Sequence, residues 1–367
     1  MMRIGILTFH CAHNYGAVLQ CYALQEFLKG VGHEVYVIDY RPSYLINRYS
    51  TFACRYWIGK DARKTMAKWL TEPYLFFIRK KRHRLLESFV ENKLHLFPFS
   101  SNCDFFDVVI LGSDQIWSPK LTGKKYDEVY FGKGFNSRKI AYAVSNRSIS
   151  LNSDEIEFYK SHLKGLDFIG VRESTLQKLL QPISDKPIFL NIDPTLLSDK
   201  GWTDSLRLEK PVKGAYVLLY EVSRHPENRK VAMEYAGNNN SSFVELTGML
   251  SLSYRHRKNL DQTASPEKFL SYLKYADCIF TTSFHGTSLS ILFEKNFYYI
   301  KQNTSADIRI ESLLEVLDLK ERIIDKGIVP HKYKSIDYSL VREKLALFRK
   351  ESVQYLVRAL ESQDERN

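Results

Sequence analysis

The stretch Ser283-Phe284-His285-Gly286-Thr287 has the residue types and spacing needed to bind and protonate an anion. A loop rich in Ser, Thr and Gly before an apolar helical segment exposes free amides and the positive end of the helix dipole, which suits phosphate or carboxylate. Gly286 would let a ligand approach the backbone closely, and His285 could act as acid or base near neutral pH. The alternative is a capping loop in which Ser283 and Thr287 satisfy the helix end and His285 is a packed surface residue.

Polar residues also follow several apolar segments that we interpret as strands. Because the carboxyl ends of parallel strands share one edge of a sheet, we expect these residues to line one rim. The candidates are Asn14, Tyr15, Gly16 and Gln20 at the first strand–helix turn, Asp114, Gln115 and Trp117 after a middle strand, and Arg172 after a later one.

Metal and disulfide chemistry have little support in the sequence. His10 and His13 flank Cys11, but no third ligand stands at metal spacing, so we expect no metal site. The five cysteines are scattered, odd in number and without a CxxC pair, which argues against a disulfide framework and a structural zinc site. The N-terminal segment does not resemble a signal peptide, and no apolar run is long enough to span a membrane, so we expect a cytoplasmic protein.

The order of apolar segments predicts an α/β fold with two Rossmann-like domains and parallel sheets. A strand at 4–7, a helix at 17–28 and a strand at 34–40 form a βαβ unit, and a second α/β pattern begins near residue 215. We expect an N-terminal domain at 1–200, a C-terminal domain at 201–336, and a closing helix in 337–367 that packs back on the N-terminal domain. This is a GT-B-like arrangement, which by itself says little about activity.

The net charge of +11 is concentrated in residues 41–95, where basic residues are mixed with aromatic ones. One interpretation is a helical excursion with a solvated face. The other is peripheral contact with an anionic membrane surface. The sequence contains no recognised nucleic-acid-binding module, so we expect no nucleic-acid partner.

Several segments, in order along the chain, resemble the polysaccharide pyruvyl transferase family. They are TFHCAHNYGAVLQCYALQ, VVILGSDQIWSP, KIAYAVS, VRES, NIDPTLL and SPEKFLSYLKYADCIFTTSFHGTSLSILFEKNFYYI, followed by a closing segment at 305–314. The resemblance runs from Thr8 to about Arg322. It implies transfer of a pyruvyl group from phosphoenolpyruvate to sugar hydroxyls of a surface polysaccharide or its lipid-linked precursor, with no metal, nucleotide or other cofactor.

The resemblance also assigns roles to individual residues. His285 matches the family's donor-site histidine and is the expected general acid or phosphate ligand. Some members have an arginine where this chain has Ser283, so Arg309 and Arg172 are the cations expected to replace it. The alternatives are a surface residue at a helix start for Arg309 and a salt bridge to Glu173 or Asp193 for Arg172.

The same reasoning places the acceptor sugar on the N-terminal domain. Asp114 could take the hydroxyl protons, with a helix N-cap after Ser113 as its alternative role. Trp117 could stack on a sugar face or be a core aromatic. Two other functions remain open for the chain: a GT-B glycosyltransferase that uses a nucleotide sugar, and a non-catalytic glycan-binding relative.

Overall fold

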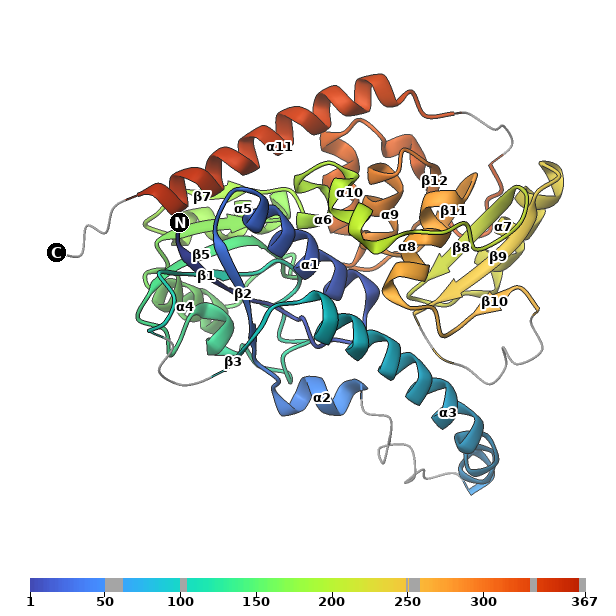
Figure 1. The fold of residues 1–367 in the computed structure, drawn as a ribbon, viewed down its shortest axis with the longest axis horizontal. Helices are drawn as coiled ribbons and strands as arrows, with labels where there is room; N and C mark the ends of the chain where they lie inside the picture. The colour runs from blue at the N-terminus through green and yellow to red at the C-terminus, as the bar shows by residue number, and fades with distance from the viewer. Residues whose placement is uncertain (50–61, 100–103, 249, 251–257, 331–334, 363–367) are drawn as a thin grey trace.

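Two parallel sheets, each flanked by helices, make up the protein (Figure 1). The computed structural model describes residues 1–49, 62–99, 104–248, 250, 258–330 and 335–362, with only the backbone of 62–72. The first sheet has the order β3-β2-β1-β4-β5-β6-β7 and the second the order β10-β9-β8-β11-β12-β13. Every pair of neighbouring strands is parallel.

The strands of the first sheet are β1 (Arg3–Leu7), β2 (Glu34–Asp39), β3 (Leu96–Pro98), β4 (Val108–Leu111), β5 (Arg138–Val144), β6 (Phe168–Val171) and β7 (Ile188–Leu190). Those of the second are β8 (Tyr216–Glu221), β9 (Ser242–Thr247), β10 (Leu260–Asp261), β11 (Cys278–Thr281), β12 (Asn296–Ile300) and β13 (Ile323–Ile324). The central strands are short, apolar and buried on both faces, as parallel strands between two helix layers must be.

The helices are α1 (Tyr15–Gly30), α2 (Ser43–Tyr49), α3 (Ala62–Lys93), α4 (Ser153–Leu163), α5 (Ser174–Leu180), α6 (Pro194–Leu197), α7 (Pro226–Asn238), α8 (Pro266–Tyr275), α9 (Phe284–Leu292), α10 (Asp307–Val316) and α11 (Tyr338–Glu361). The start of α8 is fixed as its sequence predicts, because the Ser265 hydroxyl accepts from the Lys268 amide and Pro266 occupies the first helical position. The predicted α/β class with two Rossmann-like domains in a GT-B-like arrangement is confirmed.

The closing helix α11 returns to the first domain, as predicted, and runs along one side of the molecule (Figure 1). The Tyr355 hydroxyl donates to the backbone oxygen of Ala141 in β5, and the Arg138 guanidinium donates to the backbone oxygen of Leu360. Tyr355 is buried, so this contact also removes an aromatic face from water. The helix therefore ties the end of the chain to the first sheet.

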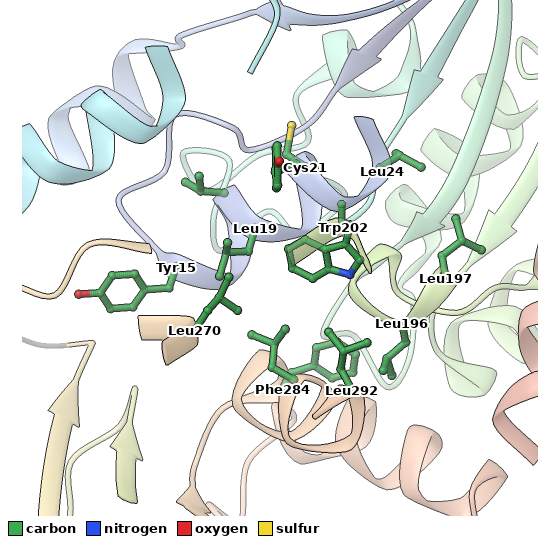
Figure 2. Packing of buried hydrophobic residues seen from close by; sticks show 14 of the residues in the cluster. Tyr15, Leu19, Cys21, Leu24, Leu196, Leu197, Trp202, Leu270, Phe284 and Leu292 are labelled. Carbon is green, nitrogen blue, oxygen red and sulfur yellow. The ribbon is translucent and has the colours of Figure 1, made fainter. Parts of the chain in front are cut away.

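One apolar core passes from the first domain into the second. It includes Tyr15 and Leu19 of α1, Leu270 of α8, and Phe284 and Leu292 of α9, with Trp202 beside them (Figure 2). Tyr15 stacks on Phe269 with the two rings nearly parallel and 4.5 Å apart. Burial of large apolar side chains at this contact holds the start of α1 against α8.

The basic segment at 41–95 is largely helical, and residues 50–61 and the side chains of 62–72 lie outside the described residues. In the described part of α3, Lys80, Lys81 and Arg84 are exposed. Arg82 is buried instead, lies over the Tyr15 ring and donates to the backbone oxygen of Thr247 in the second domain. The excursion is thus solvated on one face and bridges the domains on another. No helix among the described residues is long and apolar enough to cross a membrane.

Candidate active site between the two domains

A cavity of about 560 Å³ lies between the carboxyl-terminal edges of the two sheets. The first domain contributes Phe9, Ala12, Asn14, Ala17, Leu45, Arg48, Tyr49, Asp114, Gln115, Leu121 and Arg147 to its lining. The second contributes Val222, Ser223, Thr282, Ser283, Phe284, His285, Gln302, Thr304, Ala306, Arg309, Ile310 and Lys326. Among these residues, four Arg and Lys side chains face one carboxylate, that of Asp114, so the cavity favours an anionic ligand.

His285 lies in the first turn of α9, which begins directly after β11. Ser283 caps this helix, because its hydroxyl accepts from the Gly286 amide at 3.2 Å, and Ser283 also lines the cavity. Ser283 therefore caps the helix and also lines the cavity, so both roles considered for it in the sequence analysis occur together. The alternative that His285 is a packed surface residue is wrong, because His285 is only 7% exposed and lines the cavity. Its Nε2 has no hydrogen-bond partner among the described residues.

Asp193 lies behind His285 and is fully buried at the start of α6. Its Oδ2 is 3.6 Å from Nε2 of His285 and accepts from Nη1 of Arg172 at 2.5 Å, while its Oδ1 accepts from the Thr195 amide. Burial alone would raise the pKa of Asp193, but His285 and Arg172 outweigh it and hold the pKa below the usual value. Asp193 is therefore a carboxylate, and it lies close enough to the imidazole of His285 to orient it.

Arg172 is buried and takes part in two ionic contacts. Besides Asp193, its Nη2 lies 3.4 Å from Oδ1 of Asp114. The alternative of a salt bridge is thus confirmed for Asp193, while Glu173 accepts a hydrogen bond from Ser145 instead. Arg172 does not line the cavity itself; it holds Asp114, which does.

Arg309 is buried in the first turn of α10 and lines the cavity, so the alternative of a surface residue is wrong. It has no ion pair with a described carboxylate, and its Nε has no hydrogen-bond partner among the described residues. Burial, together with Arg172 and Arg147, lowers the pKa of Arg309 to about 10, which still leaves it charged at neutral pH. The guanidinium lies 5.5 Å from the centre of the Phe284 ring, and that of Arg172 lies 4.4 Å from the same centre.

Arg147 and Lys326 also line the cavity, and the sequence analysis did not select them. Burial lowers the pKa of Arg147, and its Nε likewise has no hydrogen-bond partner in the described part of the chain. Arg147 follows the end of β5, so the rule that strand ends carry site residues would have selected it. Lys326, which donates to the backbone oxygen of Gln302, lies in a loop with no such signal.

Three predicted substrate contacts are core or interface residues in the structure. Trp117 is fully buried, stacks on Phe131 and donates its indole N–H to the backbone oxygen of Tyr130, so it cannot stack on a sugar. Tyr15 packs between the domains and donates to the backbone oxygen of Ala264. Gln20 is buried and donates to the Thr8 hydroxyl. All three lie outside the cavity lining because their aromatic or amide groups are used for packing.

Three further residues that were predicted to bind substrate contact other parts of the protein instead. A Cβ on Gly16 would lie 2.0 Å from Nδ1 of His285, so this glycine makes room for the histidine. A Cβ on Gly286 would meet the Thr281 hydroxyl at 2.3 Å, so that glycine fits α9 against β11 and not against a ligand. Thr287 is fully buried and donates to the backbone oxygen of Ser283.

Asp114 does not cap a helix, because no helix begins directly after it in the structure. It has a positive φ of 76° and forms an isolated bridge with Val144, while its side chain lines the cavity beside Gln115. A positive φ is costly for a residue other than glycine and is often retained at functional sites. Asn14 caps α1 through its Oδ1 and lines the same wall.

The chain resembles known proteins at two levels. Solved structures with a similar fold include the glycosyltransferase SnogD from Streptomyces nogalater, with 12% identity, 98% of each chain covered and a TM-score of 0.44. They also include the UDP-GlcNAc 2-epimerase from Methanocaldococcus jannaschii, with 11% identity, 100% of this chain and 94% of that chain covered, and a TM-score of 0.46.

No curated protein matches the sequence. The polysaccharide pyruvyl transferase family model matches residues 14–303, which is most of the chain and includes both walls of the cavity. The chain therefore belongs to the polysaccharide pyruvyl transferase family.

Proposed function

We propose that the protein transfers a pyruvyl group from phosphoenolpyruvate to a pair of hydroxyls on a sugar of a polysaccharide or its lipid-linked precursor. The product would be a cyclic ketal, and inorganic phosphate would be released. The observation that carries this proposal is the cavity lined by His285, the buried Arg309 and the partly buried Arg147. Neither arginine has a carboxylate partner among the described residues.

Phosphoenolpyruvate carries a phosphate and a carboxylate, and each needs fixed positive charge in a site with little water. Arg309 and Arg147 supply guanidinium groups whose N–H donors match oxyanion geometry, and Lys326 adds a third charge on the same cavity. A buried guanidinium without a counter-ion is costly unless a ligand pairs with it. These cations, two from the second domain and one from the first, therefore support an anionic donor in the cavity between the domains.

The reaction also needs proton transfer. Protonation of the methylene carbon generates an oxocarbenium-like centre at the adjacent carbon, to which the first sugar hydroxyl adds. The second hydroxyl then displaces phosphate, so that two carbon–oxygen bonds form and the bond to the phosphate oxygen breaks. His285, whose Nε2 lies 3.6 Å from the Asp193 carboxylate, is the proposed acid, and Arg309 and Arg147 are proposed to stabilise the leaving phosphate.

Asp114 is proposed as the base that takes a proton from the acceptor hydroxyl. It lies on the opposite wall from His285, and its carboxylate is held by Arg172, which also binds Asp193. One guanidinium thus connects the proposed base to the carboxylate that orients the proposed acid. This arrangement places the proposed acid on the second domain and the proposed base on the first, at the same cavity.

The direct test is incubation with phosphoenolpyruvate and a panel of galactose-, glucose- and mannose-type acceptors, in free, polymeric and lipid-linked form. We expect release of inorganic phosphate and a mass increase equal to one pyruvate ketal. Thermal stabilisation by nucleoside diphosphates and not by phosphoenolpyruvate would instead support a nucleotide-sugar glycosyltransferase. No stabilisation by either donor and no product with any acceptor would support a non-catalytic glycan-binding protein.

A lipid-linked acceptor would bring the protein to the inner face of the cell membrane, and we propose a peripheral contact there through α3. Phe77 is 69% exposed on this helix, close to the exposed Lys80, Lys81 and Arg84. Such a mixture favours anionic lipid surfaces. Sedimentation with vesicles that contain anionic lipid should carry the protein down, and the triple change Lys80→Glu, Lys81→Glu and Arg84→Glu should abolish this. Equal sedimentation with neutral vesicles would contradict the electrostatic contact.

A further inference from the structure

Two histidines and a glutamate meet outside the cavity, where the loop after β1 contacts α3. His83 and Glu87 are four residues apart on α3 and therefore project from the same face of the helix. His13 comes from the loop, and its Nε2 lies 3.0 Å from Oε1 of Glu87. The His13 and His83 rings are 4.1 Å apart, and one potential ligand atom from each of the three residues lies within 4.8 Å of the other two.

The charges around this cluster favour a cation. Glu87 uses its Oε2 to accept from Arg41 at 3.1 Å, which leaves Oε1 facing the two histidines. Arg41 also donates to Asp39, which in turn is hydrogen-bonded to His10. One guanidinium is thus shared between two carboxylates, so the hydrogen-bonded group carries a net negative charge when its histidines are neutral.

His83 has no role in the hydrogen bonding of the described residues. It makes an edge contact with His13, and no described group donates to or accepts from its ring nitrogens. An imidazole without a described partner beside a second imidazole that is hydrogen-bonded to a carboxylate favours a metal site, because one metal ion can bind all three groups together.

We propose that His13, His83 and Glu87 form a binding site for one divalent transition-metal ion of the zinc class. Two imidazole nitrogens and a carboxylate oxygen match the ligands that Zn²⁺ takes, and water would complete a tetrahedral set. Arg41 orients the carboxylate from its other oxygen and is a positioning residue. The proposal does not depend on the proposed function.

The site would act on structure and not on the chemistry in the cavity. None of its three residues lines the cavity, but Ala12 and Asn14, on either side of His13, do. The His13 ring also lies 5.5 Å from that of Tyr49, another lining residue. A bound metal would therefore tie the acceptor-side loop to α3, at the point where this helix leaves the first domain.

The test uses the full chain, stripped with a chelator and then titrated with Zn²⁺ by calorimetry and with Co²⁺ by visible absorption. We expect one ion per chain, a rise in melting temperature on binding, and a Co²⁺ spectrum of low-coordinate type. His83→Ala should weaken binding by about 100-fold or more, since loss of even an outer-shell partner costs about 10–100-fold. The matched control is His162→Ala, a partly buried histidine on α4 that is 4.0 Å from Glu128 and lacks a third ligand.

Folding of each variant is checked by circular dichroism, and His13→Asn serves as a second variant if His83→Ala is unstable. Absence of Zn²⁺ and Co²⁺ binding by the stripped wild-type chain would overturn the proposal. So would binding that His83→Ala and His13→Asn leave unchanged, or that His162→Ala weakens as much. Pyruvyl transfer plays no part in these readouts, so their failure is distinguishable from failure of the proposed function.

Discussion

Two strand–helix turns meet at the cavity, one from β1 into α1 and the other from β11 into α9, and they are built alike. Asn14 and Ser283 cap the two helices, and an aromatic residue opens each of them. The second helical residue differs: it is Gly16 in α1 and His285 in α9, and these two residues touch. The same local geometry thus supplies a titratable side chain on one domain and the space for it on the other.

This difference gives the two similar turns different roles. The α9 turn faces the buried Asp193 and Arg309, so its histidine stands among fixed charges. The α1 turn faces protein, since Tyr15 is buried against Phe269 and Gly16 against His285. If the comparison is right, substitutions in α9 alter chemistry directly, while those in α1 act through position or stability.

The largest effect is expected from His285→Ala. Removal of the proposed acid should lower the rate of pyruvyl transfer by about 10²–10⁴-fold, the usual contribution of general acid–base catalysis, with no loss of folded protein. Phosphate release under saturating phosphoenolpyruvate measures this rate. The control His162→Ala should keep wild-type activity, and an active His285→Ala variant would remove His285 from the chemistry.

Gly16→Ala tests whether the α1 turn acts through His285. A Cβ at 2.0 Å from Nδ1 must displace the imidazole or separate the domains, so we expect activity to fall by about 100-fold and stability by about 1–3 kcal/mol. The matched control is Gly30→Ala at the other end of α1, where a Cβ meets nothing within 4 Å and should not destabilise. Rate assays and urea denaturation compare the two. If both variants changed activity and stability by the same amount, the proposed contact between Gly16 and His285 would be wrong.

Arg309→Ala should weaken phosphoenolpyruvate binding and also lower turnover, because Arg309 is proposed both to bind the donor and to stabilise the leaving phosphate. Loss of a charge-assisted hydrogen bond costs about 1.5–3 kcal/mol, which corresponds to about 10–100-fold in the dissociation constant. Calorimetric titration measures it, with Arg342→Ala as a control, because that arginine is 60% exposed and paired with Glu294 on the surface. An unchanged dissociation constant in Arg309→Ala would place the donor elsewhere.

The smallest effects should come from the two caps. Asn14→Ala and Ser283→Ala each remove a side-chain acceptor from a helix start, at a cost of about 1 kcal/mol in unfolding free energy. Only Ser283→Ala should also change the affinity for phosphoenolpyruvate, by a few-fold. Chemical denaturation and calorimetry on both variants test this. A shift in donor affinity for Asn14→Ala of the same size would mean that both turns bind the donor.

Much of the fold could be predicted from the sequence because it depends on local patterns. Apolar runs such as 108–111 and 278–281 indicate buried strands by their short length and the polar residues that follow them. Ser265-Pro266 marks a helix start without reference to any other part of the chain. The return of α11 to the first domain was predicted from the GT-B-like architecture and not from a local pattern. The other predictions needed no contact between distant residues.

The site was predicted in part, and its errors have a common cause. His285 and Arg309 were selected by pattern and resemblance and do line the cavity, whereas Trp117 and Tyr15 were selected by the same signals and are buried. Residue type does not reveal which face of a loop meets water, since an aromatic ring suits a core as well as a sugar. Arg147 was not selected although it follows the end of β5, where the strand-end rule places site residues.

The sequence by itself determined the parallel α/β architecture, the two domains and the loop that carries His285, because helix caps and strand runs are local properties. Only the tertiary structure decided what His285 faces: Asp193 and Gly16 reach it from two other segments of the chain, and Arg172 from a third segment holds Asp193. It also decided that His13, His83 and Glu87 converge, although His13 and Glu87 are 74 residues apart. Electrostatic and steric interactions act over distances in space, and the packing of two domains sets those distances.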